Sequence, residues 1–422
     1  MKRVEERLQP VARFMKLGVF GRNTVFSTLG LLLRATIQAV YLIMLSRWMG
    51  VSDYGLFSGY VAIALVLSPL SGWGIMVLVT RQLSKERARG REILAAALLQ
   101  VFLTGGLLLG LFWLIADHFM LLQGALSTLF LLAISELVLL PISILLINIC
   151  LAYEKGGMAS VAMCLIPVSR LCSVVAGFLV FNVDSVDGLA LFHFLGSLSG
   201  ALIAIFIAIG IVGRPIWTTA AISLRRNVAE GGKYGVGSLL NSGYLEVDKV
   251  LIIQLLSAEA LGAYNVAFRV ASIFLLPISA LLGVFLPRLF VSSSDAVAGK
   301  SFKIVFFLSM SYGAVAAAVI AVASFFMKDI FGADFHQSQT IMLLFAGWPL
   351  FFAFHQFFGC LLTGRELQRQ RLSVEFGGFF IVIMANLALL PHYGVSASIA
   401  SLYAAEFFMG LGCWVMWRRA LS

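Results

Sequence analysis

The sequence predicts an all-α polytopic membrane protein with about twelve transmembrane helices. Of its 422 residues, 61% are hydrophobic and only 12% are charged, whereas soluble proteins carry about 25% charged residues. The apolar residues form runs of roughly 20, the length needed to cross a bilayer. Helices are expected for such runs because a backbone in hydrocarbon must satisfy its own hydrogen bonds. The short alternating segments of a membrane β-barrel are absent from the sequence.

Positively charged residues predict the orientation of the spans. The expected spans, in order, are 24–46, 55–80, 93–116, 126–151, 158–181, 188–212, 235–256, 260–287, 302–326, 340–363, 373–390 and 395–417. Of the 30 Lys and Arg residues, 24 fall on the side of the N-terminus and two, Arg47 and Lys328, on the other. Because basic loops stay in the cytoplasm, both termini are predicted to be cytoplasmic. The net charge of +10 then reflects loops that face anionic lipids, and no nucleic-acid partner is expected.

A weak internal repeat predicts two six-helix lobes. An offset of 207 residues places Gly50–Ile63 over Ser257–Val270 and pairs Gly55 with Gly262. Six spans separate the two copies, so both have the same orientation, and an axis along the membrane normal relates such parallel repeats. The predicted domains are an N-terminal lobe with a basic cytoplasmic tail over 1–213, an amphipathic cytoplasmic linker over 214–233, and a C-terminal lobe over 234–422.

Nine charged residues fall inside the predicted spans, not counting Lys303, which is at the cytoplasmic end of the span over 302–326. A charged side chain at the bilayer centre costs about 2.5–3.5 kcal/mol on insertion scales. These residues must therefore face one another or water, which predicts a hydrated cavity. The set comprises Arg34, Glu136, Arg170, Glu246, Asp248, Lys249, Arg269, Glu375 and Glu406.

Arg34 and Arg170 are the leading candidates for binding an anionic substrate. Each lies near the middle of its span and has no acidic residue three or four positions away. Guanidinium binds phosphate in a bidentate manner. Arg269 could complete a cationic ring with them. Pairing of the two deep arginines with acids on other helices is the open alternative.

The acidic residues have two open interpretations, ion coupling and charge pairing. Glu246 and Lys249 share one face of a helix and can pair, whereas Asp248 points elsewhere and needs a partner on another helix. Glu136 and Glu406 could carry protons, because burial disfavours the charged form of a carboxyl group.

Three further ionisable residues inside the predicted spans receive no substrate role. Glu375 lies near a cytoplasmic helix end and is expected to be solvated. His193 and His355 are expected to be hydrogen-bonded structural residues.

No catalytic or cofactor motif accompanies the spans. The stretch Val297–Ser301 resembles part of a P-loop, but Ser294 occupies the position of the required first glycine. The five cysteines are scattered singly, so neither a metal site nor a disulfide framework is predicted. The loops are too short for a catalytic domain. We therefore expect a protein that is not an enzyme, has no cofactor, and draws any energy from an ion or substrate gradient.

Several stretches together resemble the bacterial polysaccharide or oligosaccharide flippase family. They are Phe20–Gly30, Met44–Ile63, Gly72–Ser84, Val247–Val270, Leu276–Leu289, Phe331–Phe335 and His392–Ser401. The resemblance covers most of the chain, and it implies a V-shaped pair of six-helix lobes around a cationic cavity that works by alternating access. The same superfamily includes multidrug-and-toxin extruders and lipid II flippases. Asp248 matches an acidic position of the family, and Arg34 lies where such flippases often carry a base.

The resemblance implies that the protein moves undecaprenyl-diphosphate-linked oligosaccharide repeat units, as for O-antigen or capsule, across a bacterial inner membrane. Residues expected to bind the diphosphate or acidic sugars are Arg34, Arg170, Lys249 and Arg269. Residues expected to couple a proton or sodium ion, or to pair charges, are Asp248, Glu246, Glu136 and Glu406. Membrane lipids, a polymerase and other polysaccharide assembly proteins are the further expected partners. Two alternatives stay open: a proton- or sodium-coupled multidrug exporter, and a scaffold in a glycan assembly complex.

Overall fold

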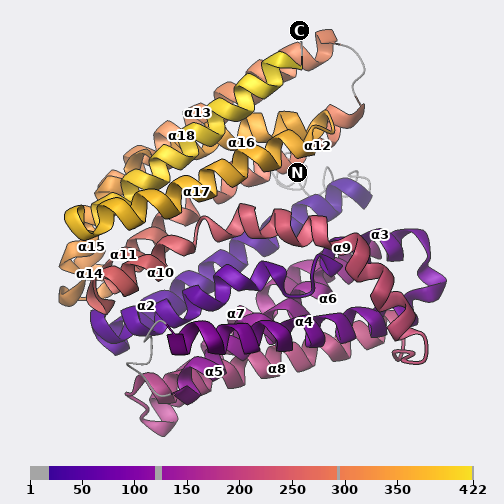
Figure 1. Ribbon diagram of the computed structural model, residues 1–422, viewed down its shortest axis with the longest axis horizontal. Coiled ribbons are helices and arrows are strands. Elements are labelled where there is room, and N and C mark those ends of the chain that lie inside the picture. The colour runs from indigo at the N-terminus through magenta and orange to yellow at the C-terminus, as the bar shows by residue number, and fades with distance from the viewer. Residues whose placement is uncertain (1–18, 119–125, 292–294, 421–422) are drawn as a thin grey trace, which may run out of the picture. The chain divides into compact units, whose positions relative to one another are not determined.

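The computed structural model describes residues 19–118, 126–291 and 295–420, which are helical over most of their length (Figure 1). The basic tail predicted over 1–22 lies mostly outside the described residues. The α-helices are α2 (Val19–Leu67), α3 (Ile75–Lys85), α4 (Gly90–His118), α5 (Leu126–Ile134), α6 (Leu140–Ala152), α7 (Gly156–Phe181), α8 (Val186–Val212), α9 (Ala220–Gly243), α10 (Val247–Leu255), α11 (Ala258–Ile273), α12 (Leu276–Val291), α13 (Asp295–Ser324), α14 (Met327–Phe331), α15 (His336–Leu344), α16 (Trp348–Gly364), α17 (Gln368–Tyr393) and α18 (Val395–Arg419).

Ten helical stretches among the described residues are long and apolar enough to cross a membrane. The first, Thr28–Leu70, has 43 residues and holds most of the first predicted span and most of the second. It is interrupted at Gly50, whose φ of 73° and ψ of 175° are not helical. At 1.5 Å per residue the stretch is about 64 Å long, roughly twice the thickness of a hydrocarbon core. The all-helical, multi-pass architecture is therefore confirmed.

The seventh predicted span, 235–256, is not one continuous helix, which corrects the sequence interpretation. α9 ends at Gly243, and α10 begins only at Val247. α9 also starts at Ala220, so it includes most of the segment expected to be a separate linker. The break is consistent with the local charges, since the turn lets Glu246 reach basic partners instead of lipid.

The second predicted span, 55–80, is also broken, between α2 and α3. Pro69 supplies no N–H for a helical hydrogen bond. Three consecutive residues, Gly72 to Gly74, then have φ values of 78°, 47° and 79°, a region that two glycines enter without steric cost. The side-chain amide of Gln100 donates a hydrogen bond to the Gly72 carbonyl at 2.7 Å. The break is therefore a fixed turn that α4 holds in place.

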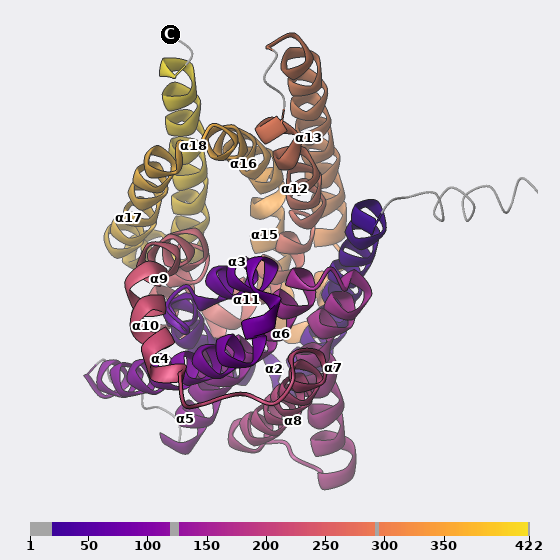
Figure 2. The ribbon, with the colours of Figure 1, turned by 90° about the vertical axis from the view of Figure 1, so that its right-hand side faces the viewer.

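Contacts divide the chain into two compact units. Unit 1 holds the described residues of Met1–Tyr41, Leu70–Val183 and Asp187–Val236, and unit 2 holds those of Leu42–Pro69, Asp184–Val186 and Gly237–Ser422. α2 and α9 each contribute to both units. In unit 2, α17 and α18 run side by side in both views (Figures 1 and 2). The predicted lobe boundaries at 213 and 233 stay predictions, because these units are defined by contacts alone.

The two glycines paired by the internal repeat touch each other in unit 2. A Cβ at Gly55 would lie 2.6 Å from the carbonyl carbon of Ala258, and a Cβ at Gly262 would lie 3.0 Å from that of Val51. Val51 and Ala258 are themselves 207 residues apart, as are Gly55 and Gly262. A contact in which i meets j and j meets i is characteristic of a two-fold axis. The contact supports the predicted axis between repeats.

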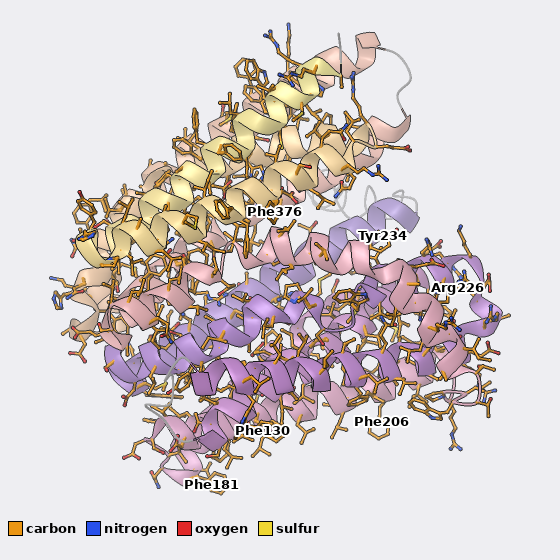
Figure 3. The ribbon with its side chains drawn as sticks, viewed as in Figure 1. Phe130, Phe181, Phe206, Arg226, Tyr234 and Phe376 are labelled. Atoms are coloured by element: carbon orange, nitrogen blue, oxygen red, sulfur yellow. The ribbon has the colours of Figure 1, made fainter. Side chains whose placement is uncertain are left out.

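Large apolar side chains cover the outside of the helices. Phe181 and Phe206 are 65% and 73% exposed, and Figure 3 shows both pointing away from the ribbon. Soluble monomers seldom expose large contiguous apolar surfaces. This surface is suited to contact with lipid tails.

Candidate functional site

A π-helical turn over Ser135–Leu139 places Glu136 in unit 1. Pro141 follows it and has no N–H to donate to the Leu137 carbonyl, four residues earlier. The hydroxyl of Ser71 donates to that carbonyl instead, at 2.5 Å. Turns of this kind frequently occur at functional sites. This one holds the Glu136 side chain in the protein interior, where the residue is only 1% exposed.

A continuous chain of polar contacts in unit 1 includes Glu136. Its Oε1 lies 2.8 Å from Arg170 Nη2 and 3.1 Å from His193 Nε2. The other ring nitrogen of His193 lies 2.7 Å from the Tyr41 hydroxyl. Arg170 Nε donates to Ser197 Oγ at 2.8 Å. The chain joins α2, the π-helical turn, α7 and α8, and it places a histidine next to a buried ion pair.

Gly196 lets α8 approach α7 at the position of Arg170. A Cβ at Gly196 would lie 2.6 Å from Arg170 Cα and 2.7 Å from the Ser169 carbonyl oxygen. Any larger residue would push the two helices apart. The close approach keeps the Arg170 side chain within reach of Ser197.

Arg34 lies near this cluster without an acidic partner. It is half-buried, and its main charged neighbour is Arg170, which repels it. Within the described parts of the chain it forms no ion pair and no side-chain hydrogen bond. A half-buried charge without a partner is unfavourable, so an anion or water is needed to stabilise it. Of the two guanidinium groups, that of Arg170 pairs with the Glu136 carboxylate, and that of Arg34 has no carboxylate partner among the described residues.

Four predicted site residues meet in a second cluster, in unit 2. Lys249 Nζ lies 3.4 Å from Glu246 Oε2 and 3.3 Å from Asp248 Oδ1. Arg269 Nη2 lies 3.4 Å from Glu246 Oε1. The expected contact between Glu246 and Lys249 is present, and Asp248 finds a base on its own helix as well. Two acids thus balance two bases.

Lys249 and Arg269 differ in how far a ligand could reach them. Lys249 is fully buried, and its ammonium lies 3.6 Å from the centre of the Phe268 ring, a cation–π contact. The Tyr264 hydroxyl donates to Asp248 and closes the cluster on that side. The side chain of Arg269 is 38% exposed. Within unit 2, Arg269 is therefore the accessible base of this cluster.

Glu406 forms a third cluster, also in unit 2, with neutral donors. Its Oε1 accepts hydrogen bonds from the Tyr244 hydroxyl at 3.1 Å and from Trp348 Nε1 at 3.2 Å. Its Oε2 lies 2.8 Å from His355 Nδ1. Glu406 and His355 are both fully buried, and among the described residues no Lys or Arg pairs with the acid. Hydrogen bonds with these side chains therefore compensate the buried carboxylate.

Sequence reasoning missed several partners and misjudged one acid. His193 and His355, given no role, each contact a predicted site carboxylate. Glu375, expected to be solvated, is only 3% exposed, and its Oε1 lies 2.7 Å from Arg371 Nε. The spacing of four residues between Arg371 and Glu375 could have revealed that pair. No sequence signal links each histidine to its acid.

Solved structures with a similar fold are membrane transporters. The MATE multidrug transporter DinF-BH is 14% identical with a TM-score of 0.68, and the match covers 95% of each chain. A MOP superfamily transporter from Pyrococcus furiosus is 12% identical with a TM-score of 0.65, covering 94% of this chain and 95% of that one. A Vibrio cholerae MATE transporter is 13% identical with a TM-score of 0.63, covering 96% of each. The protein is therefore a multi-pass membrane protein with the two-lobed fold of MATE transporters.

The family is established by sequence. The sequence model of the polysaccharide biosynthesis protein family matches residues 20–293, and the chain belongs to that family. This match confirms the resemblance drawn from the motifs, and it spans the helices in which those motifs are most frequent. A comparison with curated proteins finds no match.

Proposed function

We propose that the protein moves polyprenyl-diphosphate-linked oligosaccharides from the cytoplasmic to the outer leaflet of a bacterial inner membrane. Membership of the polysaccharide biosynthesis family and the transporter fold support this proposal. The observation that carries it is Arg34, a guanidinium in the middle of a predicted span with no acidic partner in the described chain. The protein has no catalytic role in this proposal.

The depth of Arg34 makes an anionic substrate the natural partner. Arg34 lies ten residues into the span predicted over 24–46, about 15 Å along the helix, or half of a hydrocarbon core about 30 Å thick. A cation at that depth is unfavourable by about 2.5–3.5 kcal/mol or more. A diphosphate that crosses the membrane offers the charge that Arg34 lacks, and guanidinium binds it in a bidentate manner.

The other predicted bases take different parts in the proposal. Arg170 supplies the second guanidinium, since it lies near Arg34 and shares its charge with only one acid. Arg269, which is partly exposed, contacts acidic sugars. Lys249 is buried and holds Glu246 and Asp248 in position.

We propose a proton as the coupling ion. Glu136 and Glu406 are buried carboxylates, and each contacts a histidine, His193 or His355. Each pair places an imidazole in direct contact with a buried carboxylate, and these two groups are the ones between which a proton would pass. Protonation of Glu136 would remove the charge that pairs with Arg170 and leave that base available to the diphosphate.

The test is translocation of a fluorescent polyprenyl-diphosphate-linked oligosaccharide in proteoliposomes. Arg34→Gln should lower the initial rate by about tenfold or more, the effect of losing about 1.4 kcal/mol of binding free energy. Arg34→Lys keeps the charge without the bidentate geometry and should fall in between. Lys328→Gln removes an exposed cation outside the predicted spans and serves as the matched control. A wild-type rate for Arg34→Gln would overturn the proposal.

A second candidate function is proton-coupled export of cationic drugs. Structural neighbours are described as multidrug transporters, and the Glu406 carboxylate, which has no basic partner among the described residues, could attract a cation. Glu406→Gln would then abolish efflux of a cationic dye from loaded vesicles. Dye efflux by the wild type without translocation of lipid-linked sugar would select this function over the first.

A further inference from the structure

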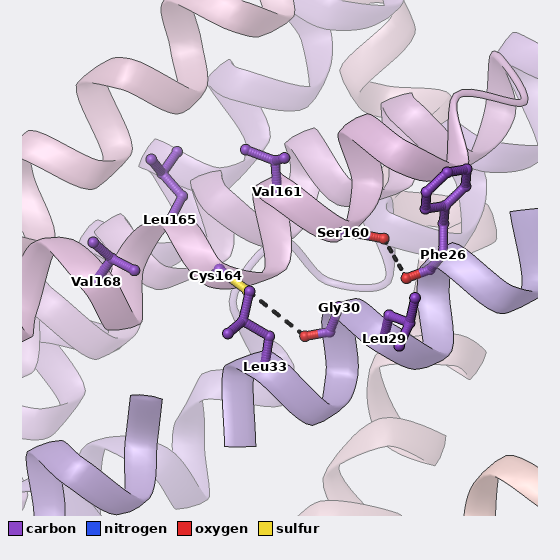
Figure 4. Close-up of a pocket in the computed structure, with 9 residues that line it drawn as sticks. All are labelled: Phe26, Leu29, Gly30, Leu33, Ser160, Val161, Cys164, Leu165 and Val168. Atoms are coloured by element: carbon purple, nitrogen blue, oxygen red, sulfur yellow. Dashed lines mark hydrogen bonds between the residues drawn. The ribbon is translucent and has the colours of Figure 1, made fainter. Parts of the chain in front are cut away.

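Unit 1 contains an apolar groove between α2 and α7 (Figure 4). Its volume is about 390 Å³. Side chains from both helices form its walls: Phe26, Leu29 and Leu33 from α2, and Val161, Leu165 and Val168 from α7. Leu33 is 54% exposed and Val161 is 63% exposed, so both walls offer hydrocarbon surface to a ligand.

The floor of the groove consists of residues that bring the two helices together. A Cβ at Gly30 would lie 2.6 Å from Ser160 Cβ, so glycine allows the helices to touch there. The Ser160 hydroxyl donates to the Phe26 carbonyl at 2.5 Å, and the Cys164 thiol donates to the Gly30 carbonyl at 3.6 Å (Figure 4). Both polar side chains thus bond to the backbone. The groove offers a ligand almost only hydrocarbon.

A positive charge lies at one end of this groove. Arg34 follows Gly30 by four residues and so lies one turn further along the same face of α2. Cys164 on the groove floor also lies near Arg34. The groove therefore joins about 10 Å of hydrocarbon wall, from Phe26 to Leu33, to a guanidinium without an acidic partner among the described residues.

We propose that this groove binds the first isoprene units of the polyprenyl chain while the diphosphate contacts Arg34. The assignment rests on the proposed function and adds to it a place for the lipid portion of the substrate. The apolar walls match a hydrocarbon chain, and the cation at the end matches the anion to which that chain is attached.

Depth distinguishes this ligand from a resident phospholipid. A phospholipid keeps its phosphate at the membrane interface, about 15 Å from the centre of the hydrocarbon core. Arg34 lies near that centre in its predicted span. An ordinary lipid whose acyl chain entered the groove would leave Arg34 without an anion. A lipid in transit through the protein carries its diphosphate to this depth.

The experiment measures binding to the full-length protein in nanodiscs of phosphatidylcholine. One probe is undecaprenyl diphosphate with a photoreactive group on its first isoprene unit, and the other is inorganic diphosphate. Val161→Trp fills the groove at an exposed wall position, so it should not disturb folding. Val180→Trp is the matched control, because Val180 is 68% exposed on the same helix and does not line the groove.

We expect Val161→Trp to weaken undecaprenyl diphosphate binding by about tenfold, the effect of losing the burial of two methylene groups. The affinity of Val161→Trp for inorganic diphosphate should stay unchanged. Val180→Trp should bind both probes as the wild type does. In the wild type, photolabelling should reach Val161 or Leu165. Equal affinity of Val161→Trp and wild type would overturn the groove assignment alone, as would displacement of the probe by phosphatidylglycerol. If the wild type binds neither probe, the proposed function fails as well.

Discussion

The reciprocal contact of Gly55 and Gly262 leads to a quantitative prediction for Gly55→Ala. The added Cβ would lie 2.6 Å from the Ala258 carbonyl carbon and 2.9 Å from the Gly262 nitrogen. An ordinary contact begins at 3.4 Å, and the Ala258 carbonyl oxygen would lie closer to the added Cβ than its carbon does, so the two helices must separate by well more than about 0.8 Å at this crossing. The obstacle is backbone, which no change of rotamer can move aside.

The expected loss of stability is about 2 kcal/mol. Overpacking typically costs about 1–3 kcal/mol, and a clash with backbone places Gly55→Ala near the upper end. Alanine also favours the helix over glycine by about 0.5–1 kcal/mol, which offsets part of this cost. The assay is denaturant unfolding of the purified full-length protein in detergent, followed by tryptophan fluorescence.

Three further variants, Gly106→Ala, Gly262→Ala and the double variant, make this test decisive. At Gly106 in α4, a Cβ would meet nothing within 4 Å, so Gly106→Ala should be stabilised by about 0.5–1 kcal/mol. The double variant of Gly55→Ala and Gly262→Ala should lose less than the sum of the single losses, because one helix separation relieves both clashes. If Gly55→Ala unfolds like Gly106→Ala, the close crossing is wrong.

Three further predictions concern charges. Glu136→Gln should destabilise the protein by about 3–5 kcal/mol, because it leaves Arg170 buried without its partner; an unchanged denaturation midpoint would contradict the buried pair. Arg371→Ala should lower the midpoint through loss of its bond to Glu375, and the exposed Arg369→Ala should not. Hydrogen bonds from Arg226 and Arg81 lower the pKa of Glu230 below its ordinary 4.5. The stability that Glu230 adds is therefore present above pH 4.5 and is lost as the pH falls through the lower pKa of the folded protein. When the melting temperature is recorded against pH, Glu230→Gln should show a flatter decline in acid than the wild type.

Local spacing explains which structural features could be predicted from the sequence. Apolar runs of bilayer length predicted the helices, and the separation of three residues between Glu246 and Lys249 predicted their contact. The interruption at Gly50 could not be predicted, because a glycine within an apolar run is compatible with a continuous helix as well as with a break.

Contacts between distant parts of the chain were beyond sequence reasoning. Glu136 and His193 are 57 positions apart, and His355 and Glu406 are 51 positions apart. Which helix face meets which is set by packing, here by close approaches such as that of α8 to α7 at Gly196. A single sequence shows which residues are polar, but it does not show which of them face one another on neighbouring helices. Both histidines therefore received a structural role.

The ion pairs formed by the predicted site residues each lie within one unit. Glu136 pairs with Arg170 inside unit 1, and the acids at positions 246 and 248 pair with Lys249 and Arg269 inside unit 2. Breaking a buried pair costs about 3–5 kcal/mol, so each pair stabilises the unit in which it lies. Arg34 is the exception among the predicted site bases of the described chain, since it has no such partner. Under the proposed function, a substrate anion therefore compensates Arg34 without displacing an acid from it.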